Sequence, residues 1–223
     1  MTYYKFLTAD GLSPYADYAW SLPTDDGPGD PVEVEGELVA CKNGIHACTL
    51  RDSFDWFNEA MYEIEFADTP QEADNKAFGR SARLVRRIDA WNARTARLLA
   101  ADFAEHVAHL WVAPEGVTWV PADTISVARR YAEGDATDEE LQAAWAAASA
   151  ARDAARDAAR SATAAARSAD SDASAAAKAA ARSAVWAAAS YAASDAAWDA
   201  ALDVERDWQN TRLAEVLGLE STP

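Results

Sequence analysis

The chain has little of what builds a disulfide scaffold or a histidine-rich catalytic centre. Its 223 residues include only two cysteines and three histidines. Cys41 and Cys48 lie seven residues apart, which is not the cysteine framework of a small secreted domain. The first residues, MTYYKFLTADG, lack a charged segment followed by an apolar one. The sequence therefore predicts no signal peptide and a cytoplasmic location.

Basic side chains are also scarce. Twenty Lys and Arg stand against 37 Asp and Glu, which gives a net charge of −17. This charge excludes nonspecific binding to nucleic acid or to an anionic membrane surface, because both carry the same sign, and it fits a basic protein partner. The alanine-rich part carries Arg or Asp every few residues, which excludes a membrane span there.

Glycine and proline are absent from 143–201, a stretch that is mostly alanine. Alanine is the best helix former, because it loses no side-chain entropy in a helix. The sequence predicts a helix over 138–168, a turn over 168–172 and a second helix over 173–217. Together they would form a long antiparallel hairpin, about 138–217, in which small side chains let the two backbones come close.

The first third of the chain has the alternating and aromatic-rich segments that are typical of strands. Residues 1–88 therefore predict a small mixed α/β module, and the fold class is α+β. Strands are expected at 3–7, 32–34, 61–66 and 78–88, with a short helix over 50–58.

From Asp89 the apolar period changes from two to 3.6, which predicts a helical region over 89–223. Helices are expected over 89–112 and from 123 or 124 to Gly134, and Thr137 with Glu140 has the pattern of a capping box. The final turns carry core residues that include Val204, Trp208, Leu213 and Leu217.

Three residues of CKNGIHAC have types that bind metal. Cys41, His46 and Cys48 have the spacing C-x4-H-x-C, and zinc would take a fourth ligand from Glu63 or Glu65. Structural zinc sites usually show two ligand pairs, and this chain shows one cluster, so we expect no cofactor. Cys48 with His46 is also a candidate nucleophile and base. The plainer interpretation is a reduced, buried cysteine pair and a histidine that bonds a neighbouring strand.

An enzymatic alternative is a small domain resembling ADP-ribosyltransferases. Those enzymes pair a strand-borne His or Arg with a Tyr and a later Glu, and His46, Tyr62 and Glu65 follow that order. Glu65 would then stabilise positive charge in the transition state. The spacing is short and the chain has no Gly-rich nicotinamide loop, which counts against this alternative.

Two parts of the chain are candidate partner-binding surfaces. The acidic loop, residues 17–37, holds seven acids and no Lys or Arg, with Asp25, Asp26 and Asp30 as candidate contacts. Trp186, Tyr191 and Trp198 either anchor a partner or fill the hairpin core. A close-packed alanine seam could also join two copies as a homo-oligomer.

Two sets of motifs resemble known families. YKFLTADGLSP, CKNGIHAC and YEIEF (Tyr62–Phe66) resemble an uncharacterised family of small domains in bacteriophages and actinobacteria. ADTISVARRYAEGDATDEELQAAWAAASAARDAA (Ala122–Ala155) and WQNTRLAEVLG are similar to the alanine-rich helical domain of putative bacterial immunity proteins. The resemblance implies a phage, prophage or conflict-related context.

These observations favour a non-enzymatic protein-binding accessory protein of phage, prophage or immunity-like type. It would present a rigid helical surface and the acidic loop to a protein partner. An enzyme of ADP-ribosyltransferase-like or metal-dependent type, using His46, Cys48 and Glu65, is the alternative, and a structural virion component is the second alternative.

Overall fold

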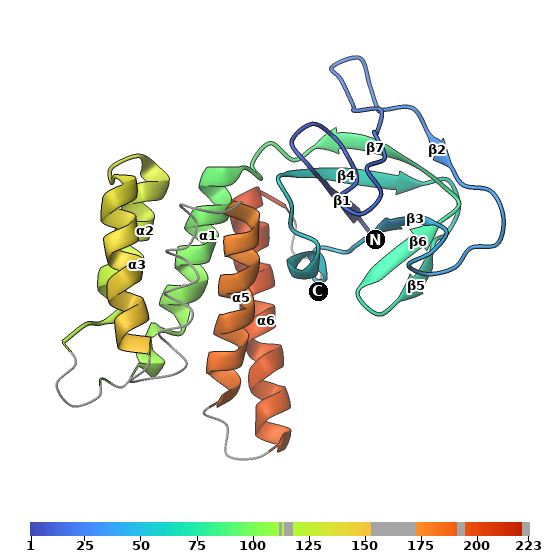
Figure 1. The fold of residues 1–223 in the computed structure, drawn as a ribbon. Coiled ribbons are helices and arrows are strands. Elements are labelled where there is room, and N and C mark those ends of the chain that lie inside the picture. The colour runs from blue at the N-terminus through green and yellow to red at the C-terminus, as the bar shows by residue number, and fades with distance from the viewer. Residues whose placement is uncertain (112, 114–117, 153–172, 191–194, 220–223) are drawn as a thin grey trace. The chain divides into compact units, whose positions relative to one another are not determined.

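The computed structural model describes residues 1–111, 113, 118–152, 173–190 and 195–219, and it divides into two compact units. The N-terminal unit ends at Asn92 and the helical unit begins at Ala93. All the described strands lie in the N-terminal unit and the described α-helices lie in the helical unit (Figure 1). The fold is therefore α+β.

The strands of the N-terminal unit form two antiparallel sheets. A β-bulge between Glu63 and Ile64 shifts the pairing of the two central strands of the first sheet. Paired backbone hydrogen bonds between Tyr4 and Cys48 (2.8 and 3.0 Å) join the two sheets. The first sheet has the order β1 (Tyr3–Leu7), β4 (Ala60–Phe66), β7 (Ser81–Arg87), β2 (Val32–Glu33), and the second has the order β3 (Ile45–Ala47), β6 (Lys76–Gly79), β5 (Gln71–Ala73).

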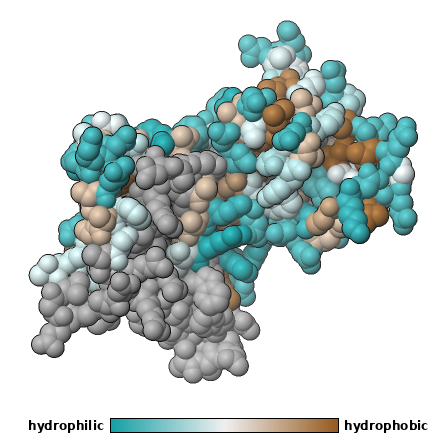
Figure 2. Space-filling model, viewed as in Figure 1, coloured by the Kyte–Doolittle hydropathy of each residue, from teal (hydrophilic) through white to brown (hydrophobic). Residues whose placement is uncertain are grey.

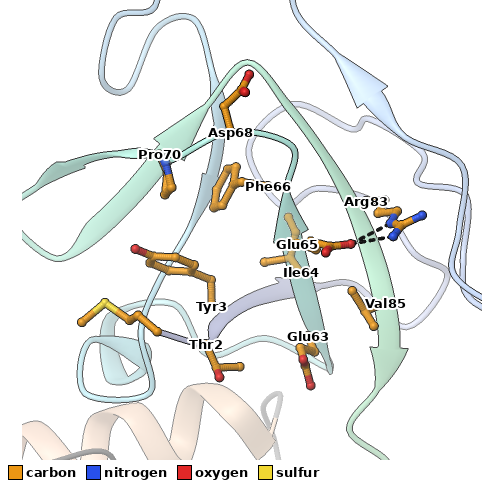
Figure 3. A pocket seen from close by; sticks show the side chains of 11 residues that line it. Thr2, Tyr3, Glu63, Ile64, Glu65, Phe66, Asp68, Pro70, Arg83 and Val85 are labelled. Atoms are coloured by element: carbon orange, nitrogen blue, oxygen red, sulfur yellow. Dashed lines mark hydrogen bonds and ion pairs between the residues drawn. The ribbon is translucent and has the colours of Figure 1, made fainter.

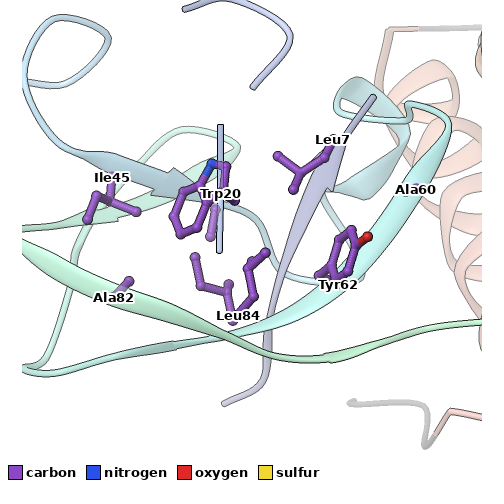
Figure 4. Packing of buried hydrophobic residues seen from close by; sticks show 9 residues of the cluster. Leu7, Trp20, Ile45, Ala60, Tyr62, Ala82 and Leu84 are labelled. Carbon is purple, nitrogen blue, oxygen red and sulfur yellow. The ribbon is translucent and has the colours of Figure 1, made fainter. Parts of the chain in front are cut away.

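Side chains from both sheets meet in one apolar cluster (Figure 4). Tyr62 and Leu84 from the first sheet and Ile45 from the second are each at most 5% exposed. Trp20, from the segment between β1 and β2, lies in the same cluster. Because strand side chains alternate between faces, Glu63 projects away from this core.

A second apolar group lies around Trp91, which is 1% exposed. Its ring contacts Phe57 and Phe6 with centroids 4.4 and 5.7 Å apart, and its indole N–H donates to the carbonyl of Asn58 (2.7 Å). Aromatic rings in such tilted and edge contacts stabilise a small unit that has few long apolar side chains.

The helical unit is built around α1, which packs against α2 and α5. Helix α3 packs against α2, and α6 packs against α5. The three α5 residues Ala177, Ala180 and Ala184 are fully buried, and small side chains of this kind allow a close approach between helices. The helices are α1 (Ala93–His106), α2 (Pro121–Glu133), α3 (Asp138–Arg152), α5 (Ala173–Ser190) and α6 (Asp195–Leu217), with 3-10 turns at Ser53–Asp55 and Ala108–Leu110.

The predicted capping box and the predicted helix end at Gly134 are confirmed, whereas the helix predicted over 89–112 is shorter, since α1 spans Ala93–His106. The Thr137 N–H donates to Glu140 Oε2 (2.9 Å) and the Glu140 N–H donates to Thr137 Oγ1 (3.2 Å), which is a reciprocal capping box. Gly134 ends α2 with φ of 85°, and Gly218 follows α6 with φ of 63°. Glycine is favoured at both positions because other residues rarely adopt a positive φ.

Several predicted elements differ from the observed ones. The predicted helix over 173–217 is present as α5 and α6, which lie side by side and antiparallel (Figure 1). The alanine face of α5 packs on α1, whereas α3 packs on α2. The predicted turn over 168–172 lies outside the described residues.

In the N-terminal unit, the predicted strand over 78–88 is divided between β6 and β7, which belong to different sheets. The predicted helix over 50–58 is reduced to the 3-10 turn Ser53–Asp55. This short turn places Phe57, 5% exposed, against Phe6 in the core.

Candidate functional site

His46 closes the turn made by the CKNGIHAC motif. Its Nε2 accepts the backbone N–H of Cys41 (3.0 Å), and the ring also bonds the carbonyl of Gly44. The imidazole stacks on Phe78, with ring centroids 5.7 Å apart. Burial, followed by the charge of Lys5, lowers the pKa of His46, so the neutral ring that accepts from Cys41 is favoured. The imidazole thus holds the turn through its own motif residues.

Asn43 of the same motif holds the end of the acidic loop. Its side-chain amide donates to the carbonyls of Glu35 (2.7 Å) and Glu37 (2.9 Å). Cys41 adopts a left-handed backbone, with φ of 62°. The motif therefore has a structural role, as the plainer interpretation expected, but the His46 side chain bonds within its own turn and Cys41 is exposed.

Cys48 is 1% exposed, and its thiol donates to the carbonyl of Tyr4 (3.6 Å). Burial raises the pKa of the Cys48 thiol well above its usual range, which disfavours the thiolate that a nucleophile or a zinc ligand needs. Cys41 is exposed. Among the described residues, no three His, Cys, Asp or Glu side chains are grouped so that they could hold a metal ion.

The three residues compared with ADP-ribosyltransferases lie in different surroundings. Tyr62 is 1% exposed within the apolar cluster, and Ile45 and Ala47, the strand neighbours of His46, lie in that same cluster. Because alternate strand residues face opposite ways, His46 points away from Tyr62. Glu65 is exposed and accepts two hydrogen bonds from Arg83. The structure does not bring the three side chains together.

Glu65 lines an open hollow of about 480 Å³ at one end of the first sheet (Figure 3). Tyr3 and Phe66 form one side of it, in an edge-to-face contact with centroids 5.5 Å apart. Its two strand carboxylates are neutralised across the sheet, since Glu65 pairs with Arg83 (2.7 Å) and Glu63 with Arg86 (2.8 Å). The paired charges make this hollow a weak candidate for ionic ligands.

Lys5 should make the stability of the N-terminal unit depend on pH. Its ammonium donates to the His46 carbonyl (2.8 Å) and lies over the Trp20 ring, and burial lowers its pKa from 10.5 to about 8. The unfolded chain keeps this proton between those two values and the folded unit loses it, so stability increases as pH rises through that window. From Lys5 alone we expect a gain of roughly 2 kcal/mol in the free energy of unfolding between about pH 7.5 and 9.5. Cys48 partly offsets it, because its raised thiol pKa lowers stability as pH rises through the same window.

Urea unfolding of wild type, Lys5→Met and the exposed control Lys42→Met at both pH values checks this expectation. Lys5→Met should lose the gain that Lys5 contributes, so its stability should rise less with pH than that of wild type, and Lys42→Met should change with pH as wild type does. An equal pH dependence in wild type and Lys5→Met would contradict it.

The segment between β1 and β2 projects from the sheet and contains most of the acidic loop (Figure 1). Trp20 fixes it to the core: the ring is 8% exposed, its indole N–H donates to Ser13 Oγ (2.9 Å) and its backbone N–H donates to Gly11 (3.1 Å). The Gly29 N–H donates to the Leu84 carbonyl of β7 (2.9 Å).

Arg80 fixes the far end of the acidic loop. Its guanidinium donates to the carbonyls of Val34 (2.9 Å) and Gly36 (2.7 Å). With Trp20, Gly29 and Asn43, this makes four attachments of the acidic loop and its flanking turn to the folded unit. An anchored loop loses little conformational entropy when it binds a partner.

Two turns of this segment carry exposed side chains. Thr24 and Gly27 exchange backbone hydrogen bonds (2.9 and 3.1 Å), which places Asp25 and Asp26 at the tip of one turn. Tyr15 is 84% exposed in the other turn. We define the loop surface as the exposed side chains Tyr15, Tyr18, Leu22, Asp25, Asp26 and Asp30.

Of this loop surface, the sequence predicted the three aspartates but not Tyr15, Tyr18 and Leu22. The signal that could have found them is the position of large apolar residues among turn-forming Pro, Asp and Gly, where burial is difficult. Figure 2 shows apolar patches among hydrophilic surface on the N-terminal unit, in the one view drawn.

The aromatic residues predicted to contact a partner lie in the helical unit. Trp186 belongs to α5 and Trp198 to α6, and the structure does not describe the surroundings of their side chains. Tyr191 lies outside the described residues.

Comparisons with known proteins were made at three levels. No protein-family model matches the chain, and searches of curated proteins and of solved structures find no significant match. No helix among the described residues has the length and apolar character needed to span a bilayer.

Proposed function

We propose that this chain is a non-enzymatic protein-binding accessory protein that presents the loop surface to a basic partner. The observation that carries this proposal is the exposure of Tyr15, Tyr18 and Leu22 on an anchored acidic segment: these side chains are 84%, 47% and 38% exposed. Exposed aromatic residues beside charges of one sign are typical of protein interfaces.

Charge supports a basic partner. The acidic loop has seven acids and no Lys or Arg, and Asp25, Asp26 and Asp30 are all exposed. Acids in this arrangement attract a partner of opposite charge during diffusion, and aromatic anchors supply most of the binding energy after contact. The Tyr18 ring makes an edge contact with Trp20, with ring centroids 5.8 Å apart. This contact already restricts the Tyr18 side chain, so the side chain loses less conformational entropy when a partner binds.

The phage, prophage or immunity-like context is part of the same proposal, and it is supported by the resemblance of the motifs. Trp186, Tyr191 and Trp198 are proposed as a second set of contact residues.

The test is affinity capture from a bacterial lysate with three forms of the full chain: wild type, Tyr15→Ala, and the triple variant Asp25→Asn, Asp26→Asn, Asp30→Asn. For the protein captured by wild type, we expect affinity about 10-fold lower for the triple variant and at least about 10-fold lower for Tyr15→Ala. Loss of the charges should also flatten the dependence of binding on salt.

A charge-matched control carries Asp123→Asn, Glu139→Gln and Asp203→Asn, all exposed acids of the helical unit. It should bind as wild type does. Retention of the captured protein by both loop variants would overturn the assignment of the loop surface.

A further inference from the structure

The helical unit buries a carboxylate among apolar helix faces. Glu205 of α6 is 2% exposed. Its Oε2 lies 2.8 Å from Nδ1 of His106, and its Oε1 accepts from the side-chain amide of Gln209 (2.9 Å). Gln209 is 1% exposed and also donates to the carbonyl of Ala181 in α5 (3.0 Å). A carboxylate is almost never buried to this extent unless it is paired.

The imidazole of His106 is held in a fixed orientation. It stacks on Trp208 with ring centroids 3.6 Å apart and planes 1° apart, and Trp208 meets Phe103 edge-on. The His106 carbonyl bonds Nδ1 of His109 (2.9 Å). These contacts keep Nδ1 of His106 directed at the buried carboxylate of Glu205.

The neighbouring arginines have carboxylate partners of their own. Arg129 of α2 and Arg212 of α6 both pair with Asp102 of α1 (2.5 and 2.7 Å). Arg129 also pairs with Glu105, and Arg212 with Glu215. Helix α5 presents the Ala181 carbonyl toward Gln209 and carries Lys178 and Arg182. His106 of α1 is thus hydrogen-bonded to Glu205, and the charge of His109 acts on the carboxylate from further away.

We propose that His106 and Glu205 form a proton-dependent latch that fastens α6 to α1 when the pair holds a proton and loosens when that proton is lost. When the pair holds a proton, it is either an ion pair or a neutral carboxylic acid beside a neutral imidazole. Both of these states are compatible with burial. Without it, a neutral imidazole donates one hydrogen bond to a buried carboxylate whose charge is uncompensated.

The direction of the Glu205 pKa shift agrees with this pH dependence. Burial raises the pKa of Glu205, and hydrogen bonds from Gln209 and the charge of His106 only partly oppose it. A group whose pKa is raised on folding contributes stability that is fully present below its unfolded value and is lost as pH rises through the folded value. The hydrogen bond that Arg212 donates to Asp102 raises the pKa of Arg212, so this guanidinium stays charged over the range tested.

Hydrogen exchange of the α6 amides in the full chain at about pH 5.5 and 8 tests the latch. After correction for the intrinsic exchange rate, the opening equilibrium of wild-type α6 should rise at least about 10-fold at the higher pH, with β4 amides as the internal reference. Glu205→Gln keeps a side chain that can bond His106 and Gln209 without the charge. It should remove the pH dependence and protect α6 at the higher pH.

Asp203→Asn is the matched control, because Asp203 is an exposed acid of the same helix, and it should behave as wild type does. A wild-type α6 that opens equally at both pH values, or a Glu205→Gln chain that retains the pH dependence, would overturn the latch. If Glu205→Gln does not fold, the carboxyl carbon of Glu205 in wild type decides by NMR. If Glu205 or the ring of His106 titrates together with α6 opening, the latch is supported. If neither group titrates together with α6 opening, the latch is overturned.

Discussion

Trp20→Ala should destabilise the N-terminal unit by about 3–5 kcal/mol and abolish binding through the loop surface. Trp20 is 8% exposed and joins the apolar cluster to the segment that carries Tyr15 and Tyr18. Its removal leaves a cavity, takes away the indole donor to Ser13 Oγ and removes the ring under Tyr18. Stability and function should therefore fall together, because one side chain serves both.

Urea unfolding followed by hydrogen exchange of β1 and β4 amides measures this effect, since a chain of two units need not unfold in one step. Trp145→Ala is the control: Trp145 is 36% exposed in the helical unit and its loss should leave β1 and β4 unchanged. A change below about 1 kcal/mol in Trp20→Ala would show that Trp20 is not a core residue.

Gly29→Ala should have the second large effect. A Cβ at this position would lie 1.9 Å from the carbonyl oxygen of Ser21 and 2.8 Å from its carbon, and both are backbone atoms that no side-chain rotation can move. The loop would have to shift, and this shift would weaken or break the hydrogen bond from the Gly29 N–H to the Leu84 carbonyl. We expect a loss of about 3 kcal/mol in the N-terminal unit, at the upper end of the usual cost of overpacking.

The neighbouring Pro28→Ala is the control for Gly29→Ala, because Pro28 is exposed and alanine removes atoms there instead of adding them. Circular dichroism melts and hydrogen exchange at Asp30 to Val34 should separate the two variants. A Gly29→Ala chain as stable as Pro28→Ala, with normal exchange in this segment, would show that the approach to Ser21 is not close.

The residue types of the CKNGIHAC motif did not determine what its cysteines and histidine do. Its cysteines and histidine have the chemistry of a metal or nucleophile site, and the spacing alone left that interpretation open. In the folded unit His46 bonds Cys41 and Gly44, while the Cys48 thiol bonds Tyr4. Tyr4 is 44 residues from Cys48, so no local pattern could have revealed this contact.

The sequence by itself determined the elements whose causes are local. The capping box at Thr137 and the glycine ends at Gly134 and Gly218 follow from interactions within a few residues. The strand at Tyr3–Leu7 was predicted from its aromatic-rich residues, although its hydrogen-bonded partner is the distant strand β4. The lack of glycine and proline likewise predicted helix at α3, α5 and α6.

Only the tertiary structure decided which faces of these elements are buried. Val204 is 69% exposed although the apolar pattern predicted it in the core, whereas Glu205 beside it is 2% exposed. The buried stripe of α6 runs through Glu205, Gln209, Leu213 and Leu217, because His106 of α1 and the Ala181 carbonyl of α5 satisfy its polar members. A polar side chain can be buried only when a partner distant in sequence supplies its hydrogen bonds, and that partner exists only after the helices have packed.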